Sequence, residues 1–160
     1  IHIRFIKSFN AVYNRSISTV LVLDNHITGM TGHQQNPCTG LTLKNVPVEP
    51  VDIEKVCKSL GLRVRTVDPG DLKECKKVLQ EETAIAEPSV IIVRRPCALL
   101  KKVVKKPALT IDGEKCKKCK ACMKIGCPAI SFDGEKVSID KTLCVGCDLC
   151  KQLCAFDAIK

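Results

Sequence analysis

The sequence predicts two units: an α/β unit with a mainly parallel sheet, followed by a small α+β unit rich in cysteine. Short apolar runs alternate with helical patterns between residues 19 and 93, which is typical of a parallel sheet with crossover helices. Eight of the twelve cysteines then form two similar runs between Cys116 and Cys154. Such regular cysteine spacing indicates a unit built around metal.

The first half of the α/β unit contains a helix, a strand and a polar loop. Residues 5–14 fit the end of an amphipathic helix, with Asn14 as its stop. Residues 19–23 (T-V-L-V-L) are apolar and β-branched, as expected for a strand buried on both faces. A polar, glycine-rich segment follows this strand. Because ligands of open α/β sheets bind beyond the carboxyl ends of strands, this loop is a candidate site.

The second half of the α/β unit repeats the alternation. Gly61 closes a predicted helix, Asp71 caps another, and the second strand of this half (S-V-I-I-V) reads as fully buried. The expected elements are a helix over 51–60, a strand over 62–67, a helix from 71 to about 86, and a strand over 89–93.

The pattern changes over residues 98–108, where periodicity fades, lysines cluster and Pro107 interrupts. We place the α/β unit at residues 1–100, a linker at 101–108 and the cysteine-rich unit at 109–160. In the last unit a hairpin is expected around Asp133-Gly134. The unit also contains an internal repeat, in which a cysteine run, a short helix and a strand occur twice.

The two cysteine runs have the spacing of iron–sulfur ligands. Each run reads C-x2-C-x2-C, and a fourth cysteine follows after four intervening residues in the first run and after three in the second. Three thiolates on a tight loop wrap one face of a cluster, and the fourth ligand comes from the other run. The predicted ligands are Cys116, Cys119, Cys122 and Cys154 for one [4Fe-4S] cluster, and Cys144, Cys147, Cys150 and Cys127 for the other.

Structural zinc is the alternative for these cysteines. Zinc needs four ligands in two pairs and has no use for a third evenly spaced cysteine. The arrangement is similar to that of the two-cluster bacterial ferredoxins. It departs from them in having one residue more than the commonest spacing before Cys127, and Ala155 where proline is usual. Neither departure removes a ligand.

Composition excludes several kinds of partner and compartment. Only 3% of residues are aromatic and no nucleic-acid motif is visible, so no nucleic-acid partner is expected despite the formal net charge of +9. No apolar run approaches membrane-spanning length and no leader is visible. Because the runs commit most cysteines to metal rather than to disulfides, we expect a reducing, anaerobic cytoplasm.

Lysines concentrate around the first cysteine run. This distribution fits an acidic redox partner that is steered by charge, and it equally fits a merely solvated surface. The lysines are Lys101, Lys102, Lys105, Lys106, Lys115, Lys117, Lys118, Lys120 and Lys124.

The loop L-D-N-H-I-T-G-M-T-G-H-Q-Q-N-P, residues 23–37, resembles the thiamine-diphosphate-binding loop of 2-oxoacid:ferredoxin oxidoreductases. The stretches N-A-V-Y-N (10–14) and R-R-P-C-A-L-L (94–100) resemble, more narrowly, the large subunit of indolepyruvate ferredoxin oxidoreductases. The resemblance covers the chain from about residue 9. It implies a partial thiamine-diphosphate-binding fold followed by a two-[4Fe-4S] ferredoxin-like domain, as a C-terminal piece of a longer polypeptide.

The resemblance also implies binding residues. Asn25 would offer its side-chain oxygen and Ile27 its main-chain carbonyl to Mg²⁺, which prefers oxygen ligands shared with phosphate. Thr28, Thr31 and Gly32 would line the loop over thiamine diphosphate, with Gly32 allowing close backbone approach. The family's magnesium-binding aspartate has no counterpart upstream of Asn25 in this sequence. The piece by itself is therefore expected to be inactive, and no catalytic residue is assigned to it.

The function implied by the resemblance is oxidative decarboxylation of aryl 2-oxoacids, indolepyruvate among them, to acyl-coenzyme A. Electrons would pass through the two clusters to an external ferredoxin, in a complex with a smaller beta subunit. Two other functions stay open: a non-catalytic electron carrier fused to a degenerate α/β domain, and an oxidoreductase of pyruvate or branched-chain 2-oxoacids.

Several features of the sequence have a plainer interpretation. The 23–37 loop is also compatible with an ordinary Asn/Gly-rich turn. His26 and His33 could touch phosphate or substrate, but solvated loop histidines are commoner. No role is assigned to the cysteines outside the two runs, which are Cys38, Cys57, Cys75 and Cys97.

Overall fold

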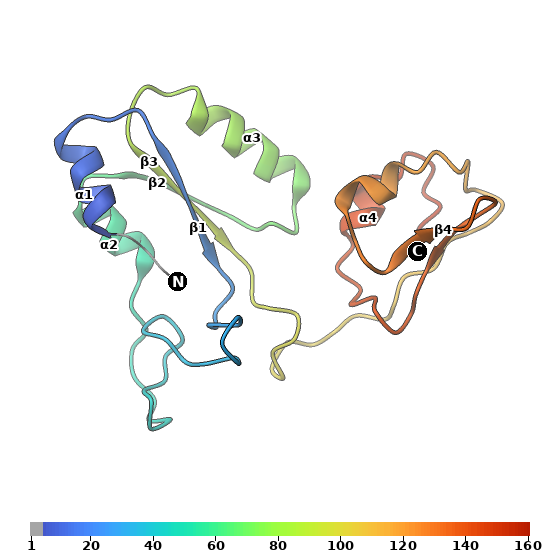
Figure 1. The fold of residues 1–160 in the computed structure, drawn as a ribbon, viewed down its shortest axis with the longest axis horizontal. Coiled ribbons are helices and arrows are strands. Elements are labelled where there is room, and N and C mark those ends of the chain that lie inside the picture. Colours follow the sequence, from blue (N-terminus) through green and yellow to red (C-terminus); the bar gives the residue numbers. More distant parts are fainter. Residues whose placement is uncertain (1–4) are drawn as a thin grey trace. The chain divides into compact units, whose positions relative to one another are not determined.

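The structure is a computed structural model that describes residues 5–160, with side chains from residue 9 onward. The chain divides into two compact units, residues 1–100 and 101–160 (Figure 1). Each is described by itself below. Among the described residues, no helix combines the length and the apolar character needed to cross a membrane.

The first unit is a three-stranded parallel sheet with helices, as predicted. The strand order is β1-β3-β2, and Thr19 of β1 and Arg63 of β2 both stand opposite Ser89 of β3. Parallel neighbours require crossover connections, and the helices supply them. The elements are α1 (Phe5–Tyr13), β1 (Thr19–Asp24), α2 (Ile53–Ser59), β2 (Arg63–Val67), α3 (Leu72–Thr83) and β3 (Ser89–Arg94).

Strand β3 lies at the centre of this unit's core. On one face, Val90 and Ile92 pack with Val22 of β1 and with Ile53 and Cys57 of α2. On the other face, Ile91 packs with Val67 of β2 and Val78 of α3. Figure 1 shows α1 and α2 on one side of the sheet and α3 on the other. Because β3 is covered on both faces, its first four residues are fully buried, as predicted.

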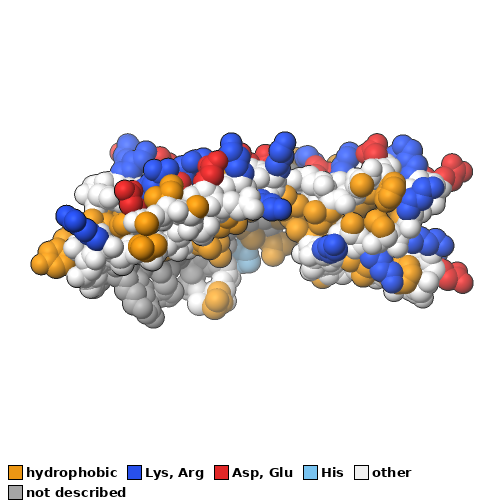
Figure 2. All heavy atoms as spheres, turned by 90° about the horizontal axis from the view of Figure 1, so that it is seen from above, with side chains coloured by type: hydrophobic (Ala, Val, Ile, Leu, Met, Phe, Trp, Pro, Cys, Tyr) orange, Lys and Arg blue, Asp and Glu red, His pale blue; other side chains and the backbone are white. Residues whose placement is uncertain are grey.

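The prediction that β1 is buried on both faces was wrong. Leu21 is 52% exposed and Leu23 is 69% exposed, although Val22 and Asp24 on the opposite face are buried. Helix α3 packs against β2 and β3, and no described strand pairs with the outer edge of β1. Apolar side chains accordingly remain visible on the surface among the charged ones (Figure 2). The apolar residues 19–23 correctly predicted a strand, but they did not predict how much of its surface other elements cover.

Helix α3 is held at both ends by carboxylates. The Asp71 side chain accepts a hydrogen bond from the Glu74 N–H at 2.9 Å, which confirms the predicted cap. The helix ends at Thr83 rather than near residue 86, and Pro88 disfavours helical backbone just before it. In the last turn, the fully buried Glu82 accepts from Arg63 Nε at 3.1 and 3.2 Å, which ties α3 to β2.

The second unit is a small α+β arrangement. The hairpin predicted around Asp133-Gly134 is present: β4 pairs antiparallel with β5, and the Asp133 carboxylate accepts from the Glu135 and Lys136 N–H groups. Its elements are the 3₁₀ helix η1 (Ala121–Ile125), β4 (Ile130–Phe132), β5 (Val137–Ile139) and α4 (Leu149–Gln152). The buried core consists of Leu109, Ile130, Val137, Cys150 and Ile159.

The internal repeat of this unit is visible in its turns. Asp112 and Asp140 each stand four residues before the first cysteine of a run, and each carboxylate accepts the N–H two residues ahead. The N–H groups of Cys116 and Cys144 donate to the carbonyls of these two aspartates at 3.0 Å. After the second run the expected strand is reduced to one antiparallel bridge, between Ile159 and Ile111.

Candidate cofactor-binding loop and cysteine centres

The polar loop leaves the sheet at Asp24, which is the last residue of β1 and is buried. Its carboxylate accepts from Arg94 Nε at 2.9 Å and from the His26 N–H at 3.2 Å. The backbone N–H groups of Arg95 and Cys97 donate to the carbonyls of Asp24 and Asn25, both at 3.0 Å. The segment after β3 therefore fixes where the loop begins.

Asn25, Ile27 and Thr28 lie together at the start of this loop. The Asn25 side-chain oxygen accepts from the Ile27 N–H at 3.2 Å, and His26 between them has a left-handed backbone with φ of 59°. Thr28 and Gln34 pair through two backbone hydrogen bonds of 3.0 and 3.1 Å. The Asn25 side-chain oxygen, a donor of the type that Mg²⁺ prefers, thus lies in a turn that it closes itself through the Ile27 N–H.

Thr31 and Gly32 lie at the exposed tip of the loop. The Thr31 hydroxyl donates to the Gln34 side-chain oxygen at 2.8 Å, so it stabilises the loop itself. Gly32 has φ of 102°, a conformation that residues with a Cβ rarely adopt. All five predicted residues share one loop, with three near the sheet and two at its tip.

A polar cavity lies beside the loop, and most of the residues that line it were not predicted from the sequence. Its volume is about 400 Å³, and neither Asn25 nor Ile27 lines it. Burial, followed by the nearby Asp24, raises the pKa of the Cys38 thiol. Only the R-R-P-C stretch, which follows the predicted strand in sequence, could have indicated from the sequence that Arg94 lies at this cavity. The lining residues are Asp24, His26, Cys38, Glu49, Pro50, Val51, Asp52, Glu54, Lys55 and Arg94.

The other three cysteines outside the runs lie in the core or in local hydrogen bonds of the first unit. Cys57 is buried in the core beneath β1 and β3, and burial raises its pKa. Cys75 donates a hydrogen bond to the Asp68 carbonyl at 3.1 Å. Cys97 follows β3, and its N–H donates to Asn25 as described above.

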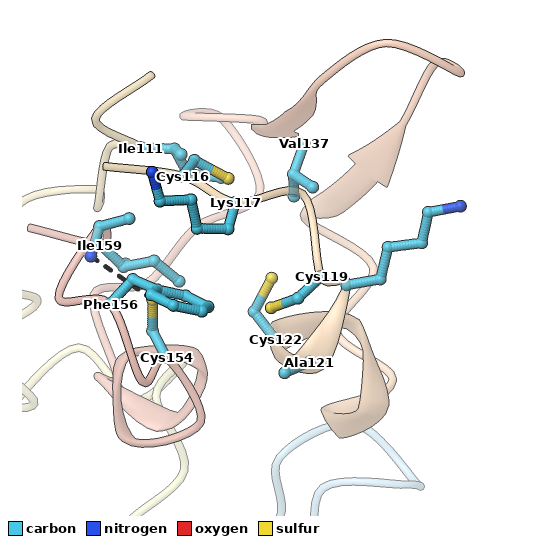
Figure 3. Close-up of a pocket in the computed structure, with 12 residues that line it drawn as sticks. Ile111, Cys116, Lys117, Cys119, Ala121, Cys122, Val137, Cys154, Phe156 and Ile159 are labelled. Carbon is cyan, nitrogen blue, oxygen red and sulfur yellow. Dashed lines mark hydrogen bonds between the residues drawn. The ribbon is translucent and has the colours of Figure 1, made fainter. Parts of the chain in front are cut away.

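The structure brings the first predicted quartet together. Cys116, Cys119, Cys122 and Cys154 line one pocket, and their sulfur atoms face a shared space bordered by Phe156 (Figure 3). Cys154, which comes from the second run, follows α4, and the Ala158 N–H donates to its sulfur at 3.4 Å. Burial, followed by the neighbouring Cys116, Cys119 and Cys154, raises the pKa of the Cys122 thiol.

The second quartet lines a separate pocket with mostly apolar walls. Cys144, Cys147 and Cys150 are joined there by Cys127 from the first run, together with side chains such as Leu143 and Val145. The Leu109 N–H donates to the Cys144 sulfur at 3.4 Å. Burial raises the pKa of Cys150 to about 11, and Cys147 and Cys127 add to this rise.

Neither quartet shows the close convergence of side chains that surrounds a single metal ion. Throughout residues 5–160, no three His, Cys, Asp or Glu side chains converge as they would around one metal ion. Each quartet instead encloses a space and supplies sulfur donors, and at least one backbone N–H in each pocket points at a cysteine sulfur. Because the buried thiols are protonated when free, binding of metal there must displace protons.

The fold and the polar loop beyond β1 define an α/β domain of the cofactor-binding class, in which ligands lie at the carboxyl ends of parallel strands. The profile of the family described as thiamine pyrophosphate enzyme, C-terminal TPP binding domain, matches residues 6–93, more than half of the chain. The chain therefore belongs to the thiamine pyrophosphate enzyme family.

Its similarity to individual proteins extends through both units. It is 41% identical to the indolepyruvate oxidoreductase subunit IorA of Pyrococcus abyssi, over 94% of this chain and 25% of that protein. The identity is 40% to the IorA subunit of Thermococcus kodakarensis, with the same coverage. It is 37% to that of Archaeoglobus fulgidus, over 100% of this chain and 27% of that protein. The chain thus spans about a quarter of the length of the curated relatives it matches.

Proposed function

We propose that the chain is part of a 2-oxoacid:ferredoxin oxidoreductase that oxidatively decarboxylates aryl pyruvates, such as indolepyruvate, to acyl-coenzyme A. One observation carries this proposal: a thiamine-pyrophosphate-family domain shares its chain with two cysteine quartets, each completed by a cysteine of the other run. The names of the IorA relatives support the indolepyruvate substrate. The electron route through two [4Fe-4S] clusters to ferredoxin is part of the proposal.

The 1–100 unit contributes part of the anchor for magnesium and diphosphate. Asn25 would bind Mg²⁺ through its side-chain oxygen and Ile27 through its carbonyl, with Thr28, Thr31 and Gly32 lining the loop over the cofactor. The ion pair between Asp24 and Arg94, with Nε and Oδ2 2.9 Å apart, holds this loop to the sheet edge. Thiamine diphosphate, when bound, supplies the stabilised carbanion needed for decarboxylation.

The 101–160 unit is, in this proposal, a ferredoxin-like domain. One cluster is held by Cys116, Cys119, Cys122 and Cys154, and the other by Cys144, Cys147, Cys150 and Cys127. Two one-electron centres match a two-electron oxidation of the substrate. The proposed partners are a smaller beta subunit, an external ferredoxin, coenzyme A and the 2-oxoacid, in the cytoplasm.

The crossed ligation can be tested with paired cysteine variants after anaerobic reconstitution with iron and sulfide. The unaltered chain is expected to hold about eight irons, with a spin-coupled EPR spectrum when reduced. Cys119→Ala/Cys154→Ala removes two ligands of one proposed cluster, so about four irons should remain. Cys119→Ala/Cys127→Ala damages both clusters and should remove nearly all iron.

The control is Cys75→Ala, which lies outside both quartets and should keep the full iron content. If the two double variants exchange their behaviour, each run holds its own cluster and the crossed assignment is wrong. One or two zinc ions per chain in place of iron would reject the cluster proposal itself.

The rival functions need the full-length protein with its partner subunit. A non-catalytic electron carrier should bind neither thiamine diphosphate nor Mg²⁺, and the family membership of residues 6–93 does not favour it. Rates of decarboxylation of indolepyruvate, phenylpyruvate and pyruvate would identify the substrate class. A preference for pyruvate would contradict the aryl assignment.

A further inference from the structure

The two cysteine quartets differ in their access to solvent. Cys119 of the first quartet is exposed, and the other seven cysteines of the two quartets are half-buried or buried. Cys150 of the second quartet is buried, and its pocket is walled by apolar side chains. The first quartet is therefore the one that presents a cysteine at the surface of its unit.

Lysines surround the exposed cysteine. Lys118 and Lys120 flank Cys119 directly in sequence, and Lys117 stands two residues before it. All three lysines are exposed, and Lys117 and Lys120 line the same pocket as the quartet. We call Cys119 and these three lysines the Cys119 surface. Residues 112–123 contain four lysines and two acidic residues, Asp112 and Glu114, and Asp112 is already paired with Lys160 at 2.8 Å.

Among residues 5–160, no carboxylate forms an ion pair that would neutralise the positive charge of this surface. In the part of the chain that the structure describes, Lys117, Lys118 and Lys120 form no ion pair with a carboxylate. Lys120 instead lies over the Phe132 ring, with its nitrogen 3.8 Å from the ring centre. Lys118 and Lys120 have left-handed backbones, with φ of 53° and 59°, so the loop is a tight turn rather than an extended arm.

The equivalent loop of the second run has balanced charge. Residues 140–151 contain two lysines, Lys141 and Lys151, and two aspartates, Asp140 and Asp148. Asp148 is already paired with Lys106 at 2.6 Å. The two loops repeat the same cysteine spacing but differ in net charge. If the lysines served only to keep the surface solvated, this difference in charge would not be needed.

We propose that the Cys119 surface is the docking site for a small acidic electron-carrier protein. This inference rests on the proposed function and adds to it the exit point and the charge of the partner. Unpaired lysines steer an acidic partner and set its register, and the exposed Cys119 brings the first quartet close to whatever binds there.

Binding measurements test the surface without relying on enzyme turnover. The probe is an oxidised acidic [2Fe-2S] ferredoxin, titrated into the reconstituted 160-residue chain at low and at physiological salt. Lys117→Glu/Lys118→Glu is expected to weaken binding at low salt by about tenfold or more and to flatten the salt dependence. The matched control, Lys141→Glu/Lys151→Glu, reverses the same number of charges at the second loop and should change binding by less than about twofold.

Cross-linking gives a second readout. A carbodiimide joins lysines to carboxylates that are in contact, and mass spectrometry should place the links at Lys117, Lys118 or Lys120. Lys117→Arg/Lys118→Arg keeps the charge and should retain the affinity for ferredoxin while losing any links at these two positions. Links confined to the lysines of residues 101–106 would overturn the proposal.

The remaining outcomes separate the two proposals. If the chain holds about eight irons but both charge-reversal variants bind ferredoxin equally, the docking inference fails and the proposed function stands. If a single-stranded oligonucleotide binds this surface more tightly than ferredoxin at physiological salt, the partner class is wrong. If the chain holds no iron, the proposed function fails and the docking inference falls with it.

Discussion

At the scale of single residues, Gly146 shows how the second cysteine loop depends on one missing side chain. Its φ is 65°, and a Cβ built there would lie 2.7 Å from the Pro107 carbonyl oxygen and from the Lys106 Cβ. Gly126 in the first half has nearly the same φ, 68°, but open space around its Cβ. Comparing substitutions at these two glycines therefore separates the cost of left-handed backbone strain from the cost of a steric clash.

We expect Gly146→Ala to cost much more than Gly126→Ala. Left-handed strain alone is worth about 1–2 kcal/mol, and the clash with the 106–107 backbone adds to it only at Gly146. Anaerobic thermal unfolding would measure the loss of stability of each variant, and iron analysis would measure its iron content. If the proposed clusters are bound, Gly126→Ala should keep the full iron content, whereas Gly146→Ala should lose iron from the second quartet. Equal effects of the two variants would mean that the 106–107 segment does not pack on this loop.

At the scale of elements, β1 presents an uncovered edge. Its outer edge pairs with no described strand, and Leu21 and Leu23 are exposed on the face that α3 leaves open. An exposed edge with apolar side chains is a template for association with other chains. The 160-residue chain is therefore expected to self-associate through β1.

Leu21→Thr/Leu23→Thr should reduce this self-association, because threonine keeps the strand preference while removing apolar surface. Sedimentation velocity would measure the change. The control is Leu43→Thr, since Leu43 is 93% exposed but lies outside the sheet. If the control lowers association as much as the β1 variant, the edge is not responsible.

At the scale of the whole molecule, the two units should respond differently to removal of iron. In residues 101–160, cysteines pack within or against the core, so the proposed clusters would contribute directly to folding. In residues 1–100, the core around β3 contains none of the eight run cysteines. A chelator should therefore unfold the second unit and leave the first folded.

Hydrogen exchange can locate this effect. After chelation, peptides from residues 109–160 should lose protection, whereas peptides that contain β3 should keep it. Loss of protection in β3 together with the cysteine unit would show that the units unfold as one, contrary to the expectation.

The sequence alone was enough to predict much of the architecture. Alternating apolar runs identified the three strands of the first unit, and Asp71 and Asp133 marked a helix start and a hairpin turn through their side-chain hydrogen bonds. These features are local, because a capping carboxylate bonds to a neighbour two or three residues away. The spacing also predicted which cysteines would lie near one another, and the same two sets line two separate pockets.

What needed the tertiary structure was everything that depends on neighbours distant in sequence. The apolar run of residues 19–23 could not reveal that β1 lies at a sheet edge, because burial depends on which strands and helices arrive from elsewhere. Likewise, the pairing of Asp24 with Arg94, 70 residues apart, and the contrast between an exposed Cys119 and a buried Cys150 arise only when the chain is folded. Caps, turns and ligand spacing depend on residues that are close in sequence, whereas exposure and long-range pairing depend on how the folded chain packs.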